Sequence, residues 1–202
     1  MFIEEIKELN SQKVKIFLDN GIAFVLYKGD LSKYGISEGE VDDSIIDDIF
    51  LDVLPKRAMA RALKIITGRD MTENMLYKKL SEDGYSDEIC EDVINRLRKE
   101  RLLDDDRFIK GFIEAKSSKK SKRDILAALY EKGIDSDKAE AVYDELYSNG
   151  DLSSETDLIK SLLVKRKFDP ETASFEECQK EIQYLLRKGF SFDSIRSAMK
   201  GL

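Results

Sequence analysis

The stretch KKLSEDGYSDEICEDVINRL (78–97) decides the fold, because its pattern returns in AALYEKGIDSDKAEAVYDEL (127–146) and YLLRKGFSFDSIRSAMKGL (184–202). The three stretches align on one glycine each. A leucine stands four residues before it, and an apolar residue and then Ser or Asp follow it. This order predicts a corner between two helices: glycine ends the first in the left-handed conformation, the apolar residue packs back, and Ser or Asp caps the second. The corner residues are Leu80, Gly84, Tyr85 and Ser86; Leu129, Gly133, Ile134 and Asp135; and Leu185, Gly189, Phe190 and Ser191.

The helix after each corner carries one apolar face. Offsets of six, nine, ten and thirteen residues from the glycine are apolar in all three repeats, which is the spacing of one side of a helix. These residues are Cys90, Val93, Ile94 and Leu97; Ala139, Val142, Tyr143 and Leu146; and Ile195, Ala198, Met199 and Leu202.

A third helix fits upstream of each pair, because the glycines are 49 and 56 residues apart, too far for two helices alone. The candidate segments are KRAMARALKIIT, DDDRFIKGFIEAK and ETDLIKSLLVKRKF. The sequence therefore predicts a mainly helical chain of three tandem three-helix modules, 56–101, 102–150 and 151–202, in an elongated array. Such arrays expose long surfaces that suit an extended partner.

Residues 1–55 form a separate segment that precedes the modules. VKIFLDNGIAFVLY (14–27) is rich in β-branched and aromatic residues on both sides of Asn20-Gly21. This pattern predicts a β-hairpin whose tight turn has positive φ at both central positions. An isolated hairpin is marginal in water, so the segment must pack on itself or on the residues that follow.

Two helical stretches follow the hairpin. DLSKYGISEG (30–39) predicts a short helical turn closed by Gly35, and VDDSIIDDIFLDVL (41–54) predicts an acidic helix that ends before Pro55. The segment is strongly acidic: residues 1–55 hold 12 acids and 5 bases, a net charge of -7, whereas residues 56–202 hold 29 of each. The neutral remainder leaves room for basic patches that face an anionic partner.

Composition narrows the function classes. The sequence has no apolar run that approaches the length of roughly 20 residues needed to cross a bilayer. MFIEEIKELN does not show a basic region followed by an apolar one, as a secretion signal does, so we expect a cytoplasmic protein. Cys90 and Cys178, 88 residues apart, are expected to be buried free thiols. The chain has no histidine, the commonest general base, and neither a GxxxxGK[ST] nor a GxGxxG motif. We therefore expect no cofactor, no metal site and no catalytic residues, although carboxylate, lysine or magnesium chemistry stays open.

The acidic triplet in LLDDDRFIKGF (102–112) has a structural explanation. Asp104 stands where an N-cap belongs, and Asp105 and Asp106 fall in the first helical turn, where carboxylates interact favourably with the helix dipole. Adjacent residues point about 100° apart in a helix, so the three carboxylates cannot easily converge on one ion. We interpret the triplet as a helix start. The face behind it is expected to consist of Phe108, Phe112 and Ala115, with Ile109 and Ile113 beside it.

Three basic sets are candidate contacts with a partner or with nucleic acid. KSSKKSKR (116–123) has five bases and no acid, and is either a solvated linker or a surface that binds phosphate or acidic groups. It has no interleaved aromatic residue, which argues against base stacking. The second set lies mostly on one helix face, and the third is in LVKRKF (163–168); for both, placement on a solvated face or near a helix C-terminus is the simpler explanation. The first two sets comprise Lys116, Lys119, Lys120, Lys122 and Arg123, and Arg57, Arg61, Lys64 and Arg69.

The chain resembles the RecX family, bacterial regulators of the RecA recombinase. The resemblance rests on the order and spacing of LLDDDRF between the first two repeats, the L-x-x-x-G-aromatic-S corner, and the closing LLRKGFSFDSIRSAMK. IFLDNGIAFVLYKGDLSKYGI also resembles the N-terminal extension of RecX proteins from low-GC Gram-positive bacteria. The chain departs from the family at Thr72-Glu73-Asn74-Met75, where Ser-x-x-Glu is usual, and the middle corner lacks the aromatic residue. The first departure predicts a weaker cap.

The resemblance implies a non-catalytic protein of three-helix modules that binds RecA assembled on single-stranded DNA. We expect the chain itself to be a monomer. RecX proteins are understood to lie in the helical groove of the filament and to suppress its ATP hydrolysis, strand exchange and co-protease activity. Two rival classes remain. A free-standing helical DNA-binding protein would bind duplex DNA tightly with strong salt dependence, but no basic recognition helix is apparent. A magnesium-dependent nuclease or phosphotransferase would have to use the acidic triplet.

Overall fold

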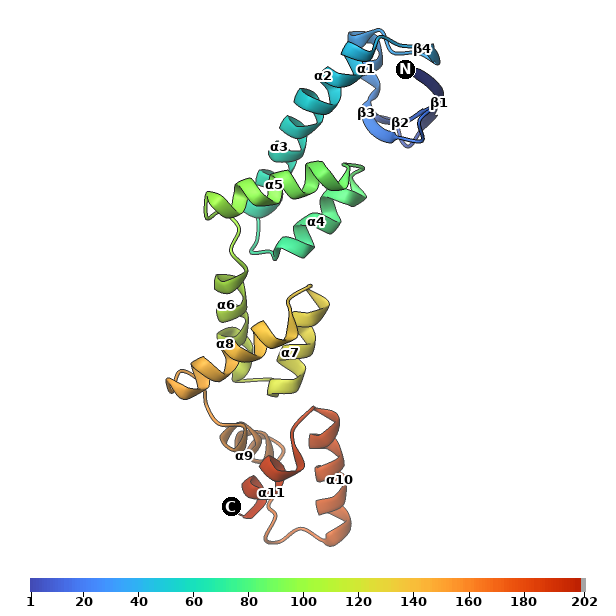
Figure 1. Ribbon diagram of the computed structural model, residues 1–202. Helices are drawn as coiled ribbons and strands as arrows, with labels where there is room; N and C mark the ends of the chain where they lie inside the picture. Colours follow the sequence, from blue (N-terminus) through green and yellow to red (C-terminus); the bar gives the residue numbers. More distant parts are fainter. Residues whose placement is uncertain (201–202) are drawn as a thin grey trace. The chain divides into compact units, whose positions relative to one another are not determined.

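The computed structural model describes residues 1–200 and divides into two compact units, Met1–Asp104 and Asp105–Leu202 (Figure 1). The first unit contains a four-stranded antiparallel sheet followed by helices, and the described part of the second unit is built of helices. The predicted fold class, mainly helical with a β-containing N-terminal segment, is confirmed.

The sheet has the strand order β3-β2-β1-β4, with β1 at Phe2–Glu8, β2 at Lys13–Leu18, β3 at Ala23–Tyr27 and β4 at Gly39–Glu40. Strands β2 and β3 form the predicted hairpin, in which Ile16 pairs with Phe24. Alternate residues of both strands are buried, as expected for a sheet with one face on the core. They are Val14, Ile16, Leu18, Phe24 and Leu26.

The turn of this hairpin differs from the expected one. Gly21 has φ of 80°, but Asn20 is not among the residues with positive φ. The Gly21 N–H donates to the Leu18 carbonyl (3.0 Å), and the Leu18 N–H donates to the Ile22 carbonyl (2.9 Å). The loop therefore has three residues with glycine last, the common alternative to a two-residue turn. The prediction of two positive φ angles was wrong, because the Asn20 side chain instead accepts from the Ile22 N–H (3.0 Å) and holds a local turn.

Strand β1 was not predicted from the sequence. It pairs with β2 along most of its length and with β4 at Phe2 and Ile3. Ile3 is buried and Ile6 is half-buried, whereas the other residues of the strand are exposed. The alternation of apolar and polar residues is thus too weak to identify a strand that is held by hydrogen bonds on both sides.

The two helical stretches after the hairpin had different outcomes. Helix α1 (Lys28–Tyr34) ends at Gly35 in the left-handed conformation, with φ of 63°, as predicted. The acidic helix does not end before Pro55: α2 (Asp43–Asp48), the π-helical segment η1 (Ile49–Val53) and α3 (Leu54–Thr67) follow without a break, as one coiled ribbon in Figure 1.

The wide turn of η1 explains how the helix continues through Pro55. In it the Leu54 N–H donates to the Ile49 carbonyl, five residues back. Proline normally interrupts a helix because it lacks an N–H and because its ring collides with the carbonyl four residues earlier. A π-turn immediately before the proline widens the backbone at that point. The prediction of a helix end was wrong because this irregular turn is not visible in the apolar pattern.

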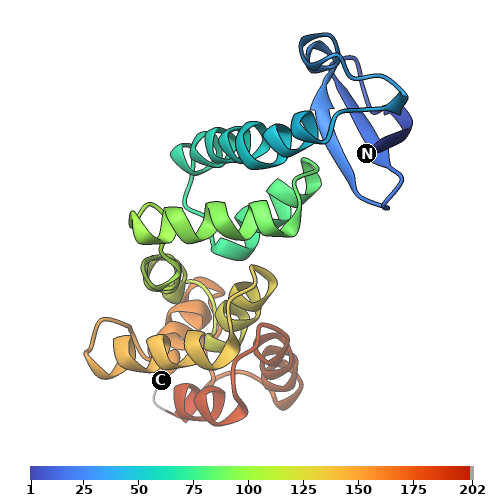
Figure 2. The same ribbon diagram turned by 45° about the horizontal axis from the view of Figure 1, so that its top comes forward.

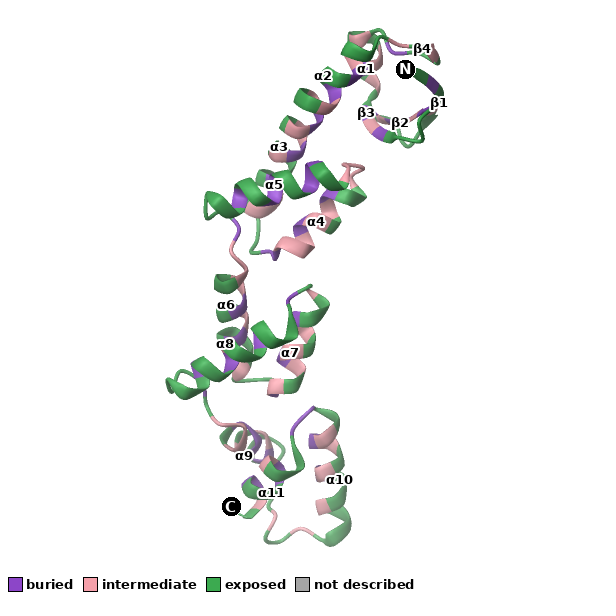
Figure 3. Ribbon diagram, in the orientation of Figure 1, coloured by how far each residue is buried: buried purple, intermediate pink, exposed green. Residues whose placement is uncertain are grey.

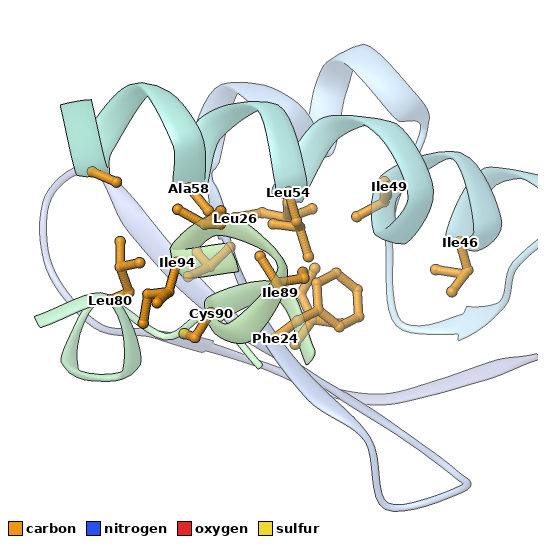
Figure 4. Packing of buried hydrophobic residues seen from close by; sticks show 14 of the residues in the cluster. Phe24, Leu26, Ile46, Ile49, Leu54, Ala58, Leu80, Ile89, Cys90 and Ile94 are labelled. Atoms are coloured by element: carbon orange, nitrogen blue, oxygen red, sulfur yellow. The ribbon is translucent and has the colours of Figure 1, made fainter. Parts of the chain in front are cut away.

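One hydrophobic core joins the sheet to α3, α4 (Glu73–Glu82) and α5 (Asp87–Lys99). Helices α3 and α5 lie side by side in both views (Figures 1 and 2). Figure 4 shows Leu54 and Ala58 of the long helix facing Cys90 and Ile94 of α5, with Leu26 of the sheet between the layers. The hairpin therefore packs on the residues that follow it, and the first unit has a continuous core.

The described part of the second unit contains two hydrophobic clusters. Helices α6 (Asp105–Ser117), α7 (Lys122–Glu131) and α8 (Ser136–Ser148) enclose the first. Helices α9 (Glu155–Lys165), α10 (Phe175–Arg187) and α11 (Phe192–Lys200) enclose the second. Buried and exposed residues alternate around these helices (Figure 3), as expected for amphipathic segments.

The buried face of α6 is rotated from the predicted one. Ile109 and Ile113 are fully buried, whereas Phe108 and Phe112 are half-buried and stack with ring centroids 5.9 Å apart. Ala115 is exposed. The prediction centred the face on the phenylalanines because they are larger, but the isoleucines occupy the contact with α7 and α8.

The three predicted corners are present, and Asp135 and Ser191 cap the following helices, but Ser86 makes no side-chain capping hydrogen bond. Gly84, Gly133 and Gly189 have φ of 96°, 80° and 85°, and the leucine four residues before each is fully buried. The apolar faces that follow are buried or half-buried, apart from Leu202, which lies outside the described residues.

The corner glycines at 84 and 189 also permit close packing. A Cβ on Gly84 would lie 2.3 Å from Val25 Cγ2 in β3, and a Cβ on Gly189 would lie 2.5 Å from Ser121 Oγ. Ordinary Cβ contacts are never so short. At both positions glycine therefore supplies a backbone conformation and room for a neighbouring element.

The cysteines are free thiols in different surroundings. Cys90 is buried in the first core, and burial raises the pKa of its thiol to about 11. Cys178 is only half-buried, so the expectation of two buried thiols was right for Cys90 alone. Among residues 1–200, no helix combines the length and the apolar character that a bilayer span requires.

Candidate functional site

The acidic triplet lies at the start of a helix. Helix α6 begins at Asp105, so Asp104 holds the preceding position, and Asp105 and Asp106 lie in the first turn. Asp106 forms an ion pair with Lys138 of α8 (2.9 Å). Across the described residues, no group of three or more Cys, Asp or Glu side chains is arranged to hold a metal ion. The triplet thus contributes to the first turn of α6 and to its contact with α8.

Replacement of Asp104 by alanine should lower the free energy of unfolding by about 1 kcal/mol, because the first turn of α6 would lose its capping residue. Urea unfolding of the wild type and the variant measures this difference. Addition of magnesium should leave the thermal midpoint of both proteins unchanged. A magnesium-dependent rise in the wild type that disappears in Asp104→Ala would identify a metal site instead.

The basic run 116–123 is more ordered than a flexible linker. Helix α6 continues to Ser117 and α7 begins at Lys122, so only residues 118–121 connect them. The N–H groups of Lys119 and Lys120 both donate to the Lys116 carbonyl (2.9 and 3.0 Å), which closes a tight turn. Lys116, Lys119, Lys120 and Arg123 are exposed. These four side chains form a cationic surface on a fixed backbone, which we call the α6–α7 basic turn.

Lys122 does not belong to that surface. Its ammonium group pairs with Glu140 and Asp144 of α8, both at 2.8 Å, and lies 5.4 Å from the centroid of the Tyr143 ring. Partial burial by itself would lower the pKa of Lys122, but the hydrogen bonds to the two carboxylates outweigh this and raise it. Lys122 therefore ties α7 to α8.

The start of α7 also connects to the last three helices. The Lys122 N–H donates to Glu155 Oε1 (3.1 Å), and Ser194 Oγ donates to Glu155 Oε2 (3.2 Å). Ser121 is fully buried, caps α7 by accepting from the Asp124 N–H (3.2 Å), and donates to the Lys188 carbonyl (2.9 Å). These bonds fix the basic turn against the corner that precedes α11.

Arg57 has a structural partner in the first unit. Its guanidinium donates two hydrogen bonds to Asp30 (2.5 and 2.7 Å) and lies 5.1 Å from the centroid of the Tyr27 ring. Asp30 is buried, with 5% of its surface exposed, and also accepts from the Tyr27 N–H (2.9 Å). The hydrogen bonds from Arg57 lower the pKa of Asp30 although burial acts in the opposite direction. Arg57 thus attaches α3 to the N-terminal segment.

Arg61 and Lys64 follow Arg57 along the same face of α3. Arg61 donates its Nε–H to Asp83 (2.7 Å), and Lys13 of strand β2 reaches the same carboxylate (3.4 Å). Burial would raise the pKa of Asp83, but the hydrogen bond from Arg61 and the charge of Lys13 outweigh it and lower the pKa. Lys64 is exposed and makes no ion pair with any other part of residues 1–200.

A cleft of about 460 Å³ lies over this face of α3. Its lining combines α3 with residues that the sequence alone did not associate with it: Lys13, Tyr27 and Tyr85. Arg69 is exposed beyond the end of α3 and does not line the cleft. No local motif marks the tyrosines, since they come from strand β3 and from the first corner. We call this feature the α3 cleft.

The third basic set has a mixed outcome. Arg166 forms two hydrogen bonds with the buried Glu181 of α10 (2.6 and 3.0 Å) and lies 4.0 Å from the centroid of the Tyr184 ring. Lys165 and Lys167 beside it are exposed. Arg166 therefore holds α9 to α10, and the expectation of placement near a helix C-terminus is confirmed because α9 ends at Lys165.

An N-terminal sheet followed by helices that pack in groups of three defines a modular helical protein. Family models agree with this class. The model of the first three-helix domain of RecX matches residues 58–97, and the model of its third three-helix domain matches residues 154–199.

Similar proteins extend the match to nearly the whole chain. A protein named "Regulatory protein RecX" from Finegoldia magna is 31% identical, with 96% of each chain covered. One with the same name from Caldanaerobacter subterraneus subsp. tengcongensis is 26% identical, over 96% of this chain and 95% of its own. The chain belongs to the RecX family of regulatory proteins. A crystal structure titled as regulatory protein RecX shares the fold, with a TM-score of 0.65 at 24% identity over 100% of this chain and 99% of its own.

Proposed function

We propose that this chain binds the RecA recombinase filament on single-stranded DNA and inhibits its ATPase, strand-exchange and co-protease activities. It would thereby restrain recombination and DNA repair in the cytoplasm, by binding and without a chemical step of its own. Family membership supports the regulatory role, and the α6–α7 basic turn is the observation that carries the binding mode. Its four exposed cations on a fixed backbone suit acidic protein surface or phosphate.

We further propose that three helical modules, 56–101, 102–150 and 151–202, contact successive recombinase subunits, while the acidic segment 1–55 faces away from the DNA. Such contacts would bridge subunits and oppose the rearrangements that accompany ATP hydrolysis. This placement is supported by the net charge of -7 in residues 1–55 against 29 acids and 29 bases in residues 56–202. A strand of DNA would repel the first segment and not the second.

Charge reversal of the basic turn tests this binding mode. In Lys116→Glu/Lys119→Glu/Lys120→Glu, half-inhibition of the filament ATPase should require at least about tenfold more protein, which corresponds to about 1.4 kcal/mol of binding free energy. Lys122 stays unchanged because it stabilises α7 against α8. The measurement is ATP hydrolysis by RecA on single-stranded DNA as the chain is titrated.

A control of equal charge separates this effect from net charge. Lys78, Lys99 and Lys110 are exposed lysines outside the three basic sets. Their replacement by glutamate should shift half-inhibition by no more than about twofold, because the proposed binding mode assigns no contact to these three lysines and isolated exposed charges are screened. Equal losses in both triple variants, with both proteins folded, would refute the assignment of the basic turn.

The second candidate, a free-standing helical DNA-binding protein, predicts strong binding to duplex DNA without recombinase. The four cations of the α3 cleft and the four of the basic turn would then act on any phosphate backbone. The same filament assay separates the candidates, because a competitor for bare DNA would lose its effect once the filament covers the strand.

A further inference from the structure

The α3 cleft combines cations with aromatic side chains. Arg57, Arg61 and Lys64 lie at spacings of four and three along α3, and Lys13 of β2 adds a fourth cation. The carboxylates of Asp30 and Asp83 balance two of these four positive charges. The group therefore has a net charge of +2. Internal ion pairs therefore explain some of these cations but not all of them.

Two cations retain donors for a ligand. Arg61 has five N–H donors, and within residues 1–200 its recorded hydrogen bond uses only Nε. Lys64, three residues further along the same face, makes no ion pair in this part of the chain. Together they offer a guanidinium and an ammonium group to one anionic group at the wall of the cleft.

The aromatic lining adds a second kind of contact. The Tyr27 side chain lies at the cleft with 44% of its surface exposed, and the cationic groups of Arg57 and Lys13 lie 5.1 and 5.9 Å from the centroid of its ring. Tyr85, from the first corner, is half-buried in the lining, and burial raises the pKa of its phenol to about 12. A flat face beside a phosphate-binding pair is the combination by which proteins bind unpaired nucleotides.

We propose that the α3 cleft binds a nucleotide unit of single-stranded DNA, with the phosphate at Arg61 and Lys64 and the base against Tyr27. The net charge of two positives matches one or two phosphodiesters rather than a nucleoside triphosphate. Duplex DNA keeps its bases paired and stacked, so it cannot use the tyrosine. A polyglutamate peptide has no ring that could stack on the tyrosine. This site rests on the proposed function in one respect: the single-stranded DNA that it binds would be the DNA of the RecA filament.

Direct binding to a labelled oligothymidylate of about 15 nucleotides, at the upper end of known site sizes, tests the proposal without recombinase. Lys64→Glu should weaken binding at least about fivefold and reduce the slope of log affinity against log salt by about 0.7 or more. Tyr27→Leu should weaken binding about tenfold, whereas Tyr27→Phe should bind as the wild type does, because the ring is retained.

Lys56→Glu is the matched control, since Lys56 lies on the same helix, is exposed and pairs with Asp52 outside the cleft. It should change affinity by less than about twofold. Equal losses in Lys56→Glu and Lys64→Glu would overturn the site. So would unchanged binding in Tyr27→Leu, equal affinity for duplex of the same length, or displacement by polyglutamate as readily as by unlabelled strand. Failure here with intact inhibition of the filament ATPase would reject the cleft and leave the proposed function standing.

Discussion

Gly84→Ala should lower the free energy of unfolding by about 3 kcal/mol. Two costs add at this corner. An L-residue in the left-handed region costs about 1–2 kcal/mol, and Gly84 has φ of 96°. The new methyl group would lie 2.3 Å from Val25 Cγ2 and 3.0 Å from Val25 Cβ, so strand β3 or the corner must shift. Overpacking of this kind costs about 1–3 kcal/mol. Urea unfolding with far-UV circular dichroism measures the sum.

Gly35→Ala is the control for the backbone cost alone. Gly35 has φ of 63° in the same unit, and an added Cβ would meet no atom within 4 Å. This variant should lose about 1–2 kcal/mol. Val25→Ala in the Gly84→Ala background should recover part of the packing cost, which a double-mutant cycle would show as a favourable coupling. Equal losses in Gly84→Ala and Gly35→Ala would show that β3 does not press on the corner.

Arg57→Met should lower the free energy of unfolding by about 2–3 kcal/mol. The substitution preserves an unbranched side chain of similar length but leaves the buried Asp30 carboxylate without its two-bond partner. Breaking one side of a buried ion pair costs about 3–5 kcal/mol, and we expect less because 29% of the Arg57 side chain is exposed. Lys64→Met on the same helix face should change stability by no more than about 0.5 kcal/mol.

The Arg57 effect should depend on pH in one direction. The pKa of Asp30 is lowered in the folded protein, so the pair contributes its full stability above the unfolded-state pKa of about 3.9. That contribution is lost as the pH falls through the lower folded-state value. The difference between wild type and Arg57→Met should therefore be largest near pH 7 and shrink as the pH falls to about 4 and below. A difference that grows in acid would contradict the assignment of the ion pair.

Local sequence patterns predict most of this fold because the residues that form each helix corner are close together in the sequence. Each corner combines a left-handed glycine, a packing residue and a cap within a few positions, and the following apolar face has helical spacing. Thr72 shows the limit of reading a cap from sequence. The incomplete capping box suggested a weak cap, yet Thr72 is fully buried and accepts from the Met75 N–H (3.1 Å). Tertiary packing, which is absent from the pattern, holds this cap.

The candidate sites were less predictable because they depend on contacts between distant residues. The sequence groups Lys122 with the other bases of 116–123. In the structure its ammonium group is paired with two carboxylates of helix α8. The sequence grouping also missed Lys13, Tyr27 and Tyr85, which reach the α3 cleft only because the sheet packs on α3. The helix through Pro55 was missed for another reason, because a π-helical turn leaves no mark in the apolar pattern.

ATP hydrolysis by RecA filaments on single-stranded DNA, measured while this chain is added at increasing concentration, tests the central claim most directly. The rate of ATP hydrolysis should fall progressively as the chain is added at constant total concentrations of RecA and single-stranded DNA. Filaments formed before the addition should be inhibited as well as those formed in its presence. An unchanged rate at concentrations of the folded chain well above that of RecA would contradict the account.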